Sequence, residues 1–245
     1  MGLSYETFFY LVVLFVAYSV QVVAADGGFY LGQTRVVFPS DKRSVSLQVT
    51  NQDAKKDWLL RSWVSQYDDK NKSSIPFIIT PPLYRLDGNN SIQLRINAVD
   101  VSKLPTDRES VFRINVMAIP PETATAAKPE KEGTATGSIQ FALNSRIKLL
   151  FRPVALNSPE QAEKAWEKVA IRQQEGKIIF NNPTPYYITL TNIDVNGVGL
   201  KGEQADTMIA PEGELILPVS GKIQTLSFQT INDYGGLTKK KTVTF

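Results

Sequence analysis

The sequence contains neither cysteine nor histidine. Without them the chain cannot build a Ser/His/Asp or Cys/His nucleophilic site, or almost any structural zinc site. No disulfide can support the fold, so stability must come from hydrophobic cores large enough to stand alone.

Charge of either sign is also modest. The formal net charge is +3, and removal of residues 1–25, whose only charged side chain is Glu6, would raise it to +4. The only basic run is residues 239–241, so nucleic acid is not expected as the main partner. With 42% hydrophobic and 21% charged residues in 245, the composition is that of one large or two ordinary globular domains.

An apolar run occupies residues 8–25, FFYLVVLFVAYSVQVVAA, and ends in small residues. This pattern predicts a secretory signal peptide in residues 1–25 and an exported mature chain. The alternative is an uncleaved membrane anchor, because the preceding MGLSYE has no Lys or Arg and the run approaches the ~18 residues that a membrane span needs.

Alternation of apolar and polar residues predicts a series of short strands. They are expected at residues 29–38 with an interruption at Gly32, and at 44–51, 58–66, 77–80, 91–97 and 111–119. A strand at 138–153, SIQFALNSRIKLLFRP, is far longer than the usual ~5–6 residues. One half of its apolar face could serve the core of its own domain while the other half is presented to something else.

A Pro-rich stretch at residues 153–159 predicts a domain boundary. Beyond it, residues 160–169 favour a helix, and strands are expected at 177–181, 187–192, 214–219, 223–232 and 241–245. The prediction is an all-β protein of two immunoglobulin-like β-sandwich domains, an N-terminal domain at 26–153 and a C-terminal domain at 154–245.

Two motifs suggest other chemistry and are better explained by turns and loops. Residues 197–202 match GxGxxG, but no amphipathic helix follows, so a Gly-rich hairpin loop is the better interpretation. Asp68, Asp69, Asp87 and Glu109 could be imagined as a glycosidase pair, although nothing in the sequence fixes their separation. Solvated loop carboxylates are the simpler interpretation.

Two cations on predicted strands are more informative. Arg35 stands between Thr34 and Val36, and Lys148 falls on the polar face of the long strand. Single cations among β-branched residues usually extend to the surface. The alternative is that the two converge on a carboxylate, which would bind strongly where water is excluded.

Several blocks resemble the periplasmic pilus-assembly chaperones of the chaperone/usher pathway, most closely the type 1 pilus branch. They run in order through nearly the whole mature chain: GQTRVVFP from Gly32, ITPPLYRL from Ile79, LPTDRESVFRINVMAIPP from Leu104, SRIKLLFRP from Ser145, NPTPYYITLTN from Asn182 and TINDYGGLT from Thr230. A short loop at residues 122–137 and the lack of a Cys pair match the subclass that serves rod-like pili.

The resemblance implies two immunoglobulin-like domains in an L-shaped arrangement, with a role for each of three residue groups. Arg35 and Lys148 would hold the C-terminal carboxylate of a pilus subunit. Alternating apolar residues would be lent to the subunit as its missing strand, and Glu109, Arg152 and Asp233 would form an interdomain charged cluster. The donated residues would be Ile139, Phe141 and Leu143. Phe141 is bulkier than the aliphatic residue usual there, which bears on subunit preference.

The expected function is therefore that of a non-enzymatic periplasmic chaperone that caps pilus (fimbrial) subunits and delivers them to an outer-membrane usher. No nucleotide, metal or small-molecule substrate is expected. A structural or adhesive β-sandwich protein of the cell surface is the first alternative, and a carboxylate-dependent glycosidase is a distant one.

Overall fold

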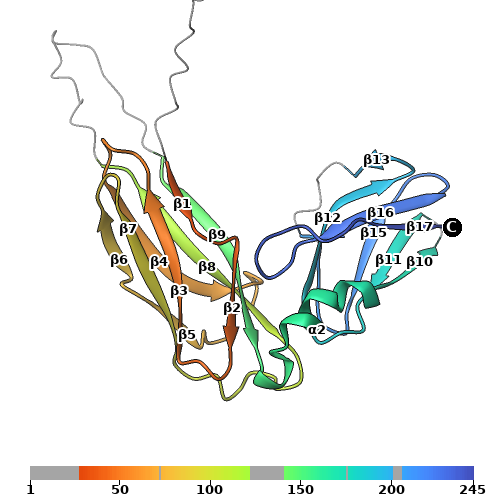
Figure 1. The fold of residues 1–245 in the computed structure, drawn as a ribbon, viewed down its shortest axis with the longest axis horizontal. Coiled ribbons are helices and arrows are strands. Elements are labelled where there is room, and N and C mark those ends of the chain that lie inside the picture. The colour runs from red at the N-terminus through yellow and green to blue at the C-terminus, as the bar shows by residue number, and fades with distance from the viewer. Residues whose placement is uncertain (1–27, 72, 122–140, 175, 201–205) are drawn as a thin grey trace, which may run out of the picture.

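The structure is a computed structural model that describes residues 28–71, 73–121, 141–174, 176–200 and 206–245. The predicted signal peptide, the loop at 122–137 and the start of the long strand, with Ile139, lie outside these ranges. Two β-sandwich domains meet at an angle (Figure 1), in agreement with the expected L-shaped pair. Within the described ranges, none of the helices has the length and apolar character that a membrane crossing requires.

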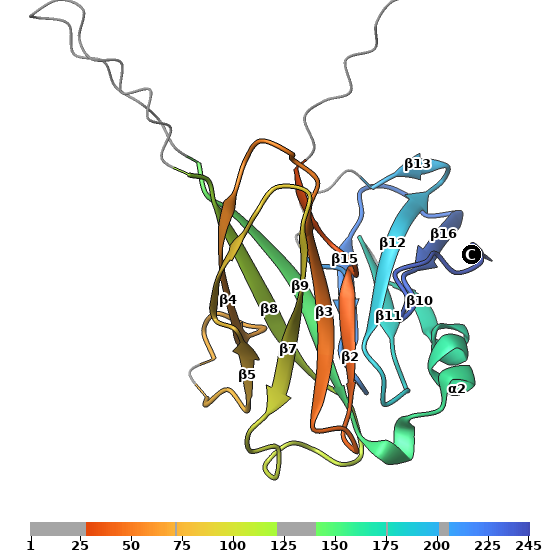
Figure 2. The same ribbon diagram turned by 60° about the vertical axis from the view of Figure 1, so that its left-hand side comes forward.

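The N-terminal domain packs a four-stranded sheet against a five-stranded one. The first has the order β1-β3-β7-β5 and the second the order β2-β9-β8-β4-β6. Their bounds are β1 Phe29–Leu31, β2 Arg35–Pro39, β3 Ser44–Asn51, β4 Trp58–Gln66, β5 Phe77–Thr80, β6 Leu83–Leu86, β7 Ser91–Ala98, β8 Ser110–Ile119 and β9 Leu143–Arg152. Figure 2 shows β3 and β7 of one layer crossing over β8 and β9 of the other.

Strand alternation explains this core. Leu47 and Val49 of β3 face Leu60 of β4 and Ile114 of β8 from opposite sheets, and all four are fully buried. The intervening residues point outward because successive side chains of a strand alternate between its faces. The strands predicted at 44–51, 58–66 and 77–80 are confirmed to the residue.

Two predictions in this domain are wrong in detail. The expected strand at 29–38 is two strands in different sheets, because β1 pairs with β3 and β2 pairs with β9. The interruption foreseen at Gly32 is where the chain changes sheet. The long strand, predicted from residue 138, begins at Leu143 within the described residues, because Phe141 and Ala142 are not part of a strand and residues 138–140 lie outside the described ranges. Leu143, the first residue of β9, pairs with Ala118 of β8. The strand β8 ends one residue later, before Pro120 and Pro121, which have no amide hydrogen to donate.

The C-terminal domain is a smaller sandwich with its own core around Phe180 and Phe228, whose rings meet edge to face. Its sheets have the orders β10-β11-β15 and β13-β12-β16-β17, with β14 added to β12. The bounds are η1 Val154–Leu156, α2 Pro159–Lys164, η2 Ala165–Lys168, β10 Ala170–Gln174, β11 Lys177–Asn181, β12 Ile188–Val195, β13 Val198–Gly199, β14 Met208–Ile209, β15 Glu214–Pro218, β16 Thr225–Thr230 and β17 Lys241–Thr244.

Local signals explain the helix and the Gly-rich segment. Ser158 caps α2 by accepting a hydrogen bond from the Gln161 amide, and Pro159 starts its first turn. Asn196 and Gly197 both have positive φ and join β12 to β13, so the first part of the GxGxxG match forms a hairpin, whereas residues 201 and 202 lie outside the described ranges. The boundary predicted between residues 153 and 154 stays a prediction. It falls between β9 and η1.

Candidate binding site between the two domains

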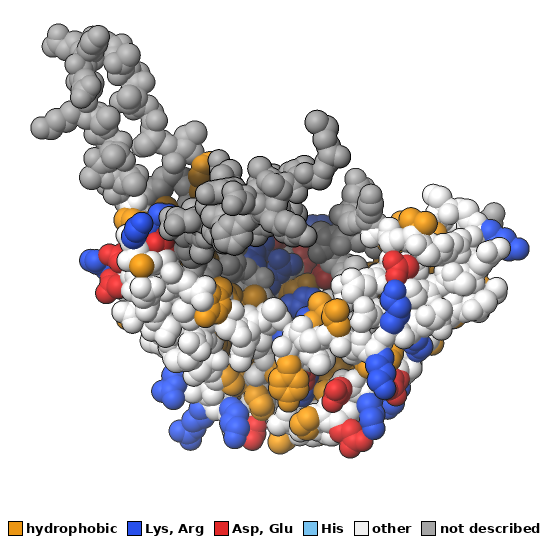
Figure 3. All heavy atoms as spheres, turned by 45° about the horizontal axis from the view of Figure 1, so that its top comes forward, with side chains coloured by type: hydrophobic (Ala, Val, Ile, Leu, Met, Phe, Trp, Pro, Cys, Tyr) orange, Lys and Arg blue, Asp and Glu red, His pale blue; other side chains and the backbone are white. Residues whose placement is uncertain are grey.

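Arg35 and Lys148 are direct register partners in the parallel pair of β2 and β9. Paired residues of neighbouring strands project from the same face of a sheet, so these two side chains lie next to each other. The sequence left open whether they extend separately to the surface or converge, and the structure brings them together. Figure 3 shows Lys and Arg side chains gathered in the hollow between the two domains.

The C-terminal domain supplies one acceptor to each of these cations. Arg35 donates from Nη1 to the carbonyl of Ile231 at 3.0 Å, and Lys148 donates from Nζ to Thr189 Oγ1 at 2.9 Å. In the described part of the chain neither forms an ion pair with a carboxylate. Both therefore keep donors that an external anion can accept from.

Burial makes the two charges costly. It lowers the pKa of Arg35, an effect that the charge of Asp233 offsets only in part. Burial also lowers the pKa of Lys148 to about 8, against the attraction of Asp206 and with help from the repulsion of Arg35 and Arg113. A carboxylate that binds between the two side chains would stabilise their charged forms and raise both pKa values.

Arg113 is a third cation in register with Arg35 and Lys148, and it was not predicted as a site residue from the sequence. It is the register partner of Lys148 on β8, and its guanidinium lies over the ring of Tyr67 at 4.4 Å. We call Arg35, Lys148 and Arg113 the cation row. A signal was available, because Arg113 is a lone cation among apolar residues of a predicted strand, as Arg35 is.

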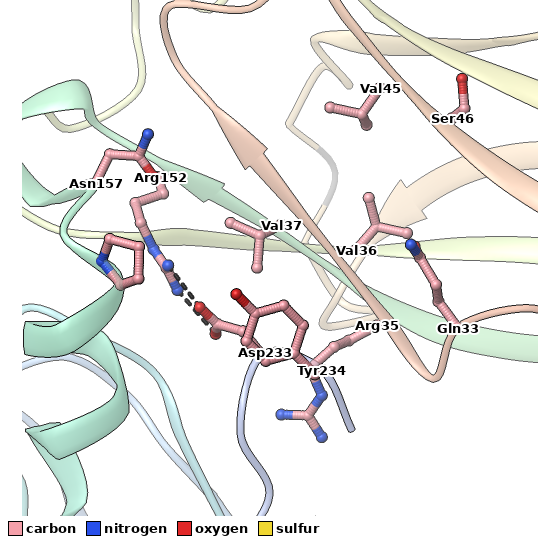
Figure 4. A pocket seen from close by; sticks show the side chains of 11 residues that line it. Gln33, Arg35, Val36, Val37, Val45, Ser46, Arg152, Asn157, Asp233 and Tyr234 are labelled. Atoms are coloured by element: carbon pink, nitrogen blue, oxygen red, sulfur yellow. Dashed lines mark hydrogen bonds and ion pairs between the residues drawn. The ribbon is translucent and has the colours of Figure 1, made fainter. Parts of the chain in front are cut away.

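Farther along β9 the structure joins Glu109, Arg152 and Asp233, which we call the Arg152 cluster. Arg152 donates from Nε to Glu109 at 2.6 Å, and its two terminal nitrogens donate to Asp233 at 2.7 and 3.0 Å. Glu109 also accepts from the amide of Tyr187 at 2.8 Å. Figure 4 shows the Arg152 guanidinium facing Asp233 beside Val37. The cluster ties the residue before β8 and the end of β9 to two segments of the C-terminal domain.

Burial alone would lower the pKa of Arg152, but the hydrogen bonds and charges of Asp233 and Glu109 outweigh it and raise this pKa. A guanidinium with carboxylates on two sides stays charged. A hollow of about 350 Å³ lies next to the cluster and is also lined by Arg35 and Tyr234.

A tight loop between the two domains positions both groups of charges. Asn232 accepts from the amides of Tyr234 at 3.1 Å and Gly236 at 2.8 Å, which folds the loop back on itself. Gly235 has φ +84°, and a Cβ there would meet Thr34 Oγ1 at 2.5 Å. Glycine thus lets the loop pack against the residue before Arg35, with Asp233 turned to Arg152.

The apolar face of β9 changes from exposed to buried along the strand. Phe141 is 79% exposed and Leu143 58%, whereas Leu149 and Phe151 are 0% and 4% exposed in the core. Phe141 precedes the strand and is not part of it. Two of the three predicted donor residues are thus uncovered, and Ile139 lies outside the described residues.

The imagined glycosidase carboxylates have separate partners on separate elements. Asp69 pairs with Arg146 at 3.0 Å, Asp87 with Arg85 at 2.9 Å, and Glu109 belongs to the Arg152 cluster. Asp68 accepts from the backbone amide of Lys70 in its own loop. The described residues also bring together no group of three carboxylates that could hold a metal ion.

Comparison with known proteins gives this arrangement a family. Residues 28–157 match the family described as "Pili and flagellar-assembly chaperone, PapD N-terminal domain", and residues 164–242 match "Pili assembly chaperone PapD, C-terminal domain". This chain is a pilus-assembly chaperone. The chaperone is 37% identical to chaperone protein FocC of Escherichia coli over 215 residues, which are 87% of this chain and 88% of FocC.

Solved structures agree with this assignment. The chaperone is similar to the periplasmic chaperone SfaE, with 36% identity and a TM-score of 0.70 over 88% of this chain and 98% of that one. It is also similar to the SafB chaperone, solved in complex with the SafA pilin of Salmonella enterica. That match has 28% identity and a TM-score of 0.75, and it covers 89% of this chain and 97% of the other.

Proposed function

We propose that this chaperone binds a pilus subunit along β9 and holds the C-terminal carboxylate of the subunit between Arg35 and Lys148. The observation that carries the proposal is that two cations, the buried Arg35 and the partly buried Lys148, stand side by side at the domain junction and neither has a carboxylate partner in the described chain. Burying an uncompensated charge is costly, so such a pair is expected where a ligand completes it.

The uncovered start of β9 supplies the second part of the interaction. A subunit that lacks one strand exposes an open edge and a groove, and both promote aggregation. Phe141 and Leu143, with Ile139, would enter that groove as donor-strand residues. The carboxylate anchor fixes the register, because a slip of one residue would turn these side chains to the opposite face.

The Arg152 cluster would hold the two domains at the angle that this binding mode needs. Its role is structural, because all of its strong donors and acceptors are used internally. The chaperone would work in the periplasm after removal of the signal peptide and deliver subunits to an outer-membrane usher. It would act by binding alone, without a catalytic step or cofactor.

Co-expression with a pilus subunit in the periplasm tests this function. The wild type and the Lys177→Ala variant, which changes an exposed lysine on β11, should each co-purify with the subunit as a one-to-one complex. Lys148→Ala should fold and yet yield no complex. Failure of the wild type to retain any of several pilus subunits would contradict the proposal and favour a structural protein of the cell surface.

A further inference from the structure

The cation row is wider than one carboxylate requires. Lys148 has Arg35 as its register partner on β2 and Arg113 as its register partner on β8. Directly opposed residues of neighbouring strands have Cβ atoms about 4.5–5.5 Å apart, so three positive side chains stand in a line across three strands. A terminal carboxylate between Arg35 and Lys148 leaves Arg113 without a counter-charge.

Arg113 keeps an unused hydrogen-bond donor within the described ranges. Its contact with Tyr67 is a cation–π interaction, and its Nε hydrogen is buried without an acceptor. Among the described residues it forms no ion pair. A half-buried guanidinium that stacks on an aromatic ring presents its edge in a fixed orientation, which favours a planar acceptor such as a carboxylate.

The chain itself brings one acidic group to this place. Burial raises the pKa of Tyr67, and the carboxylate of Asp206, from the segment before β14, raises this pKa further. The charge of Asp206 also acts on Lys148. A carboxylate of the C-terminal domain can therefore act on both Tyr67 and Lys148.

We propose that Arg113 and Tyr67 form a second anion subsite, which recognises an acidic side chain on the C-terminal residue of the bound subunit. This inference rests on the proposed function, because the terminal carboxylate must already lie between Arg35 and Lys148. A C-terminal Glu or Asp carries two carboxylates on one residue, and neighbouring cations of the row can each take one. Asp206 competes for the second subsite.

The test uses one pilus subunit in two forms whose last residue is Glu or Gln, which have nearly the same shape. The wild-type chaperone should bind the Glu form about tenfold more tightly, since a favourable close charge pair at an interface is worth at least about 1.5 kcal/mol. Arg113→Gln should lose this preference and bind the Glu and Gln forms equally. Arg113→Lys, which keeps the charge, should restore part of the preference, and Asp206→Asn should increase it.

The outcomes separate the two proposals. Equal binding of the two forms by the wild type, or an undiminished preference in Arg113→Gln, would overturn the second subsite and leave the carboxylate anchor standing. Failure of the wild type to bind either form would overturn the proposed function, and the second subsite with it.

Discussion

Lys148 and Arg152 lie four residues apart on the same face of β9, and their surroundings differ in kind. Arg152 donates to two carboxylates, one of them fully buried, and its guanidinium also lies over the ring of Tyr186, so its contacts in the described chain are internal. Lys148 has one neutral hydrogen-bond acceptor and two like-charged neighbours, and the one carboxylate that attracts it, Asp206, forms no ion pair with it. Arg146, two residues before Lys148 on this face, pairs with Asp69. The strand pattern is the same at all three positions. The segments that pack over the strand therefore decide whether a cation is paired within the protein or remains able to bind an external anion.

The comparison shows two uses of a buried charge. In the Arg152 cluster the cost of burial is offset inside the molecule, which fixes the junction of the domains. In the cation row the cost of burial is only partly offset within the molecule. A ligand that supplies an anion offsets the rest, and this free energy contributes to its binding. The variants below test the two uses separately.

The largest effect is expected from Arg152→Met, which would leave Glu109 buried without its counter-charge. Breaking a buried pair in this way should lower the free energy of unfolding by about 3–5 kcal/mol. Chemical denaturation measures it. Arg108→Gln is the matched control, because Arg108 also bridges the domains, to Glu212 at 2.9 Å, but on the surface. If Arg108→Gln were as unstable as Arg152→Met, the closed cluster would not be what holds the junction.

Lys148→Ala should act in the opposite manner, with little change in stability and a large loss of binding. Removing one partner of a buried charge pair is expected to cost about 2–5 kcal/mol of subunit affinity. Surface plasmon resonance with an immobilised subunit should show this loss mainly as faster dissociation. A variant with unchanged affinity would contradict the role of Lys148 as an anchor.

Phe141→Ser should weaken binding less. The side chain is 79% exposed in the free protein, and full burial of a Phe side chain is worth about 1.5–3 kcal/mol. Val154→Ser, at an exposed apolar position beyond the strand, is the control and should leave the affinity unchanged. Equal affinities for the wild type and Phe141→Ser would show that the donor face is misassigned.

The smallest effect is a dependence on pH. The pKa of free Lys148 is lowered to about 8, so the free site loses its proton as pH rises through that value, and a carboxylate must then bind together with a proton. Affinity should fall about tenfold from pH 7 to pH 9. Arg35, Arg113 and Asp206 face Lys148 as charged groups, and the raised pKa of Tyr67 keeps its hydroxyl protonated throughout. Titration calorimetry at both pH values should show the fall in the wild type, whereas Lys148→Arg should give a flat profile.

Much of this arrangement could be predicted from the sequence, because alternation fixes which strand residues face a core. The strands at 44–51, 58–66 and 77–80 follow from that pattern alone. The sheet change after Gly32 could not be predicted, since the pattern on both sides of it is the same and only pairing with β3 or β9 separates the two strands. The start of the long strand also depends on where its partner β8 ends.

The residues of the site could be predicted from the sequence to different degrees. Arg35 and Lys148 were singled out as lone cations on strands, but their proximity depends on the parallel register of β2 and β9. Thr189, Tyr67 and Asp206 carry no sequence signal that links them to Lys148, because each lies on a segment far from β9 in the sequence. The alternation within one strand does not predict contacts between elements that are distant in sequence.

The most direct test of the carboxylate anchor compares a synthetic peptide of a subunit's C-terminal strand as the free acid and as the C-terminal amide. We expect the wild-type chaperone to bind the free acid at least about tenfold more tightly than the amide, since loss of one charged hydrogen-bonded partner costs at least about 1.5 kcal/mol. The difference should disappear in Lys148→Ala. Equal binding of acid and amide by the wild type would contradict the claim that Arg35 and Lys148 hold a terminal carboxylate.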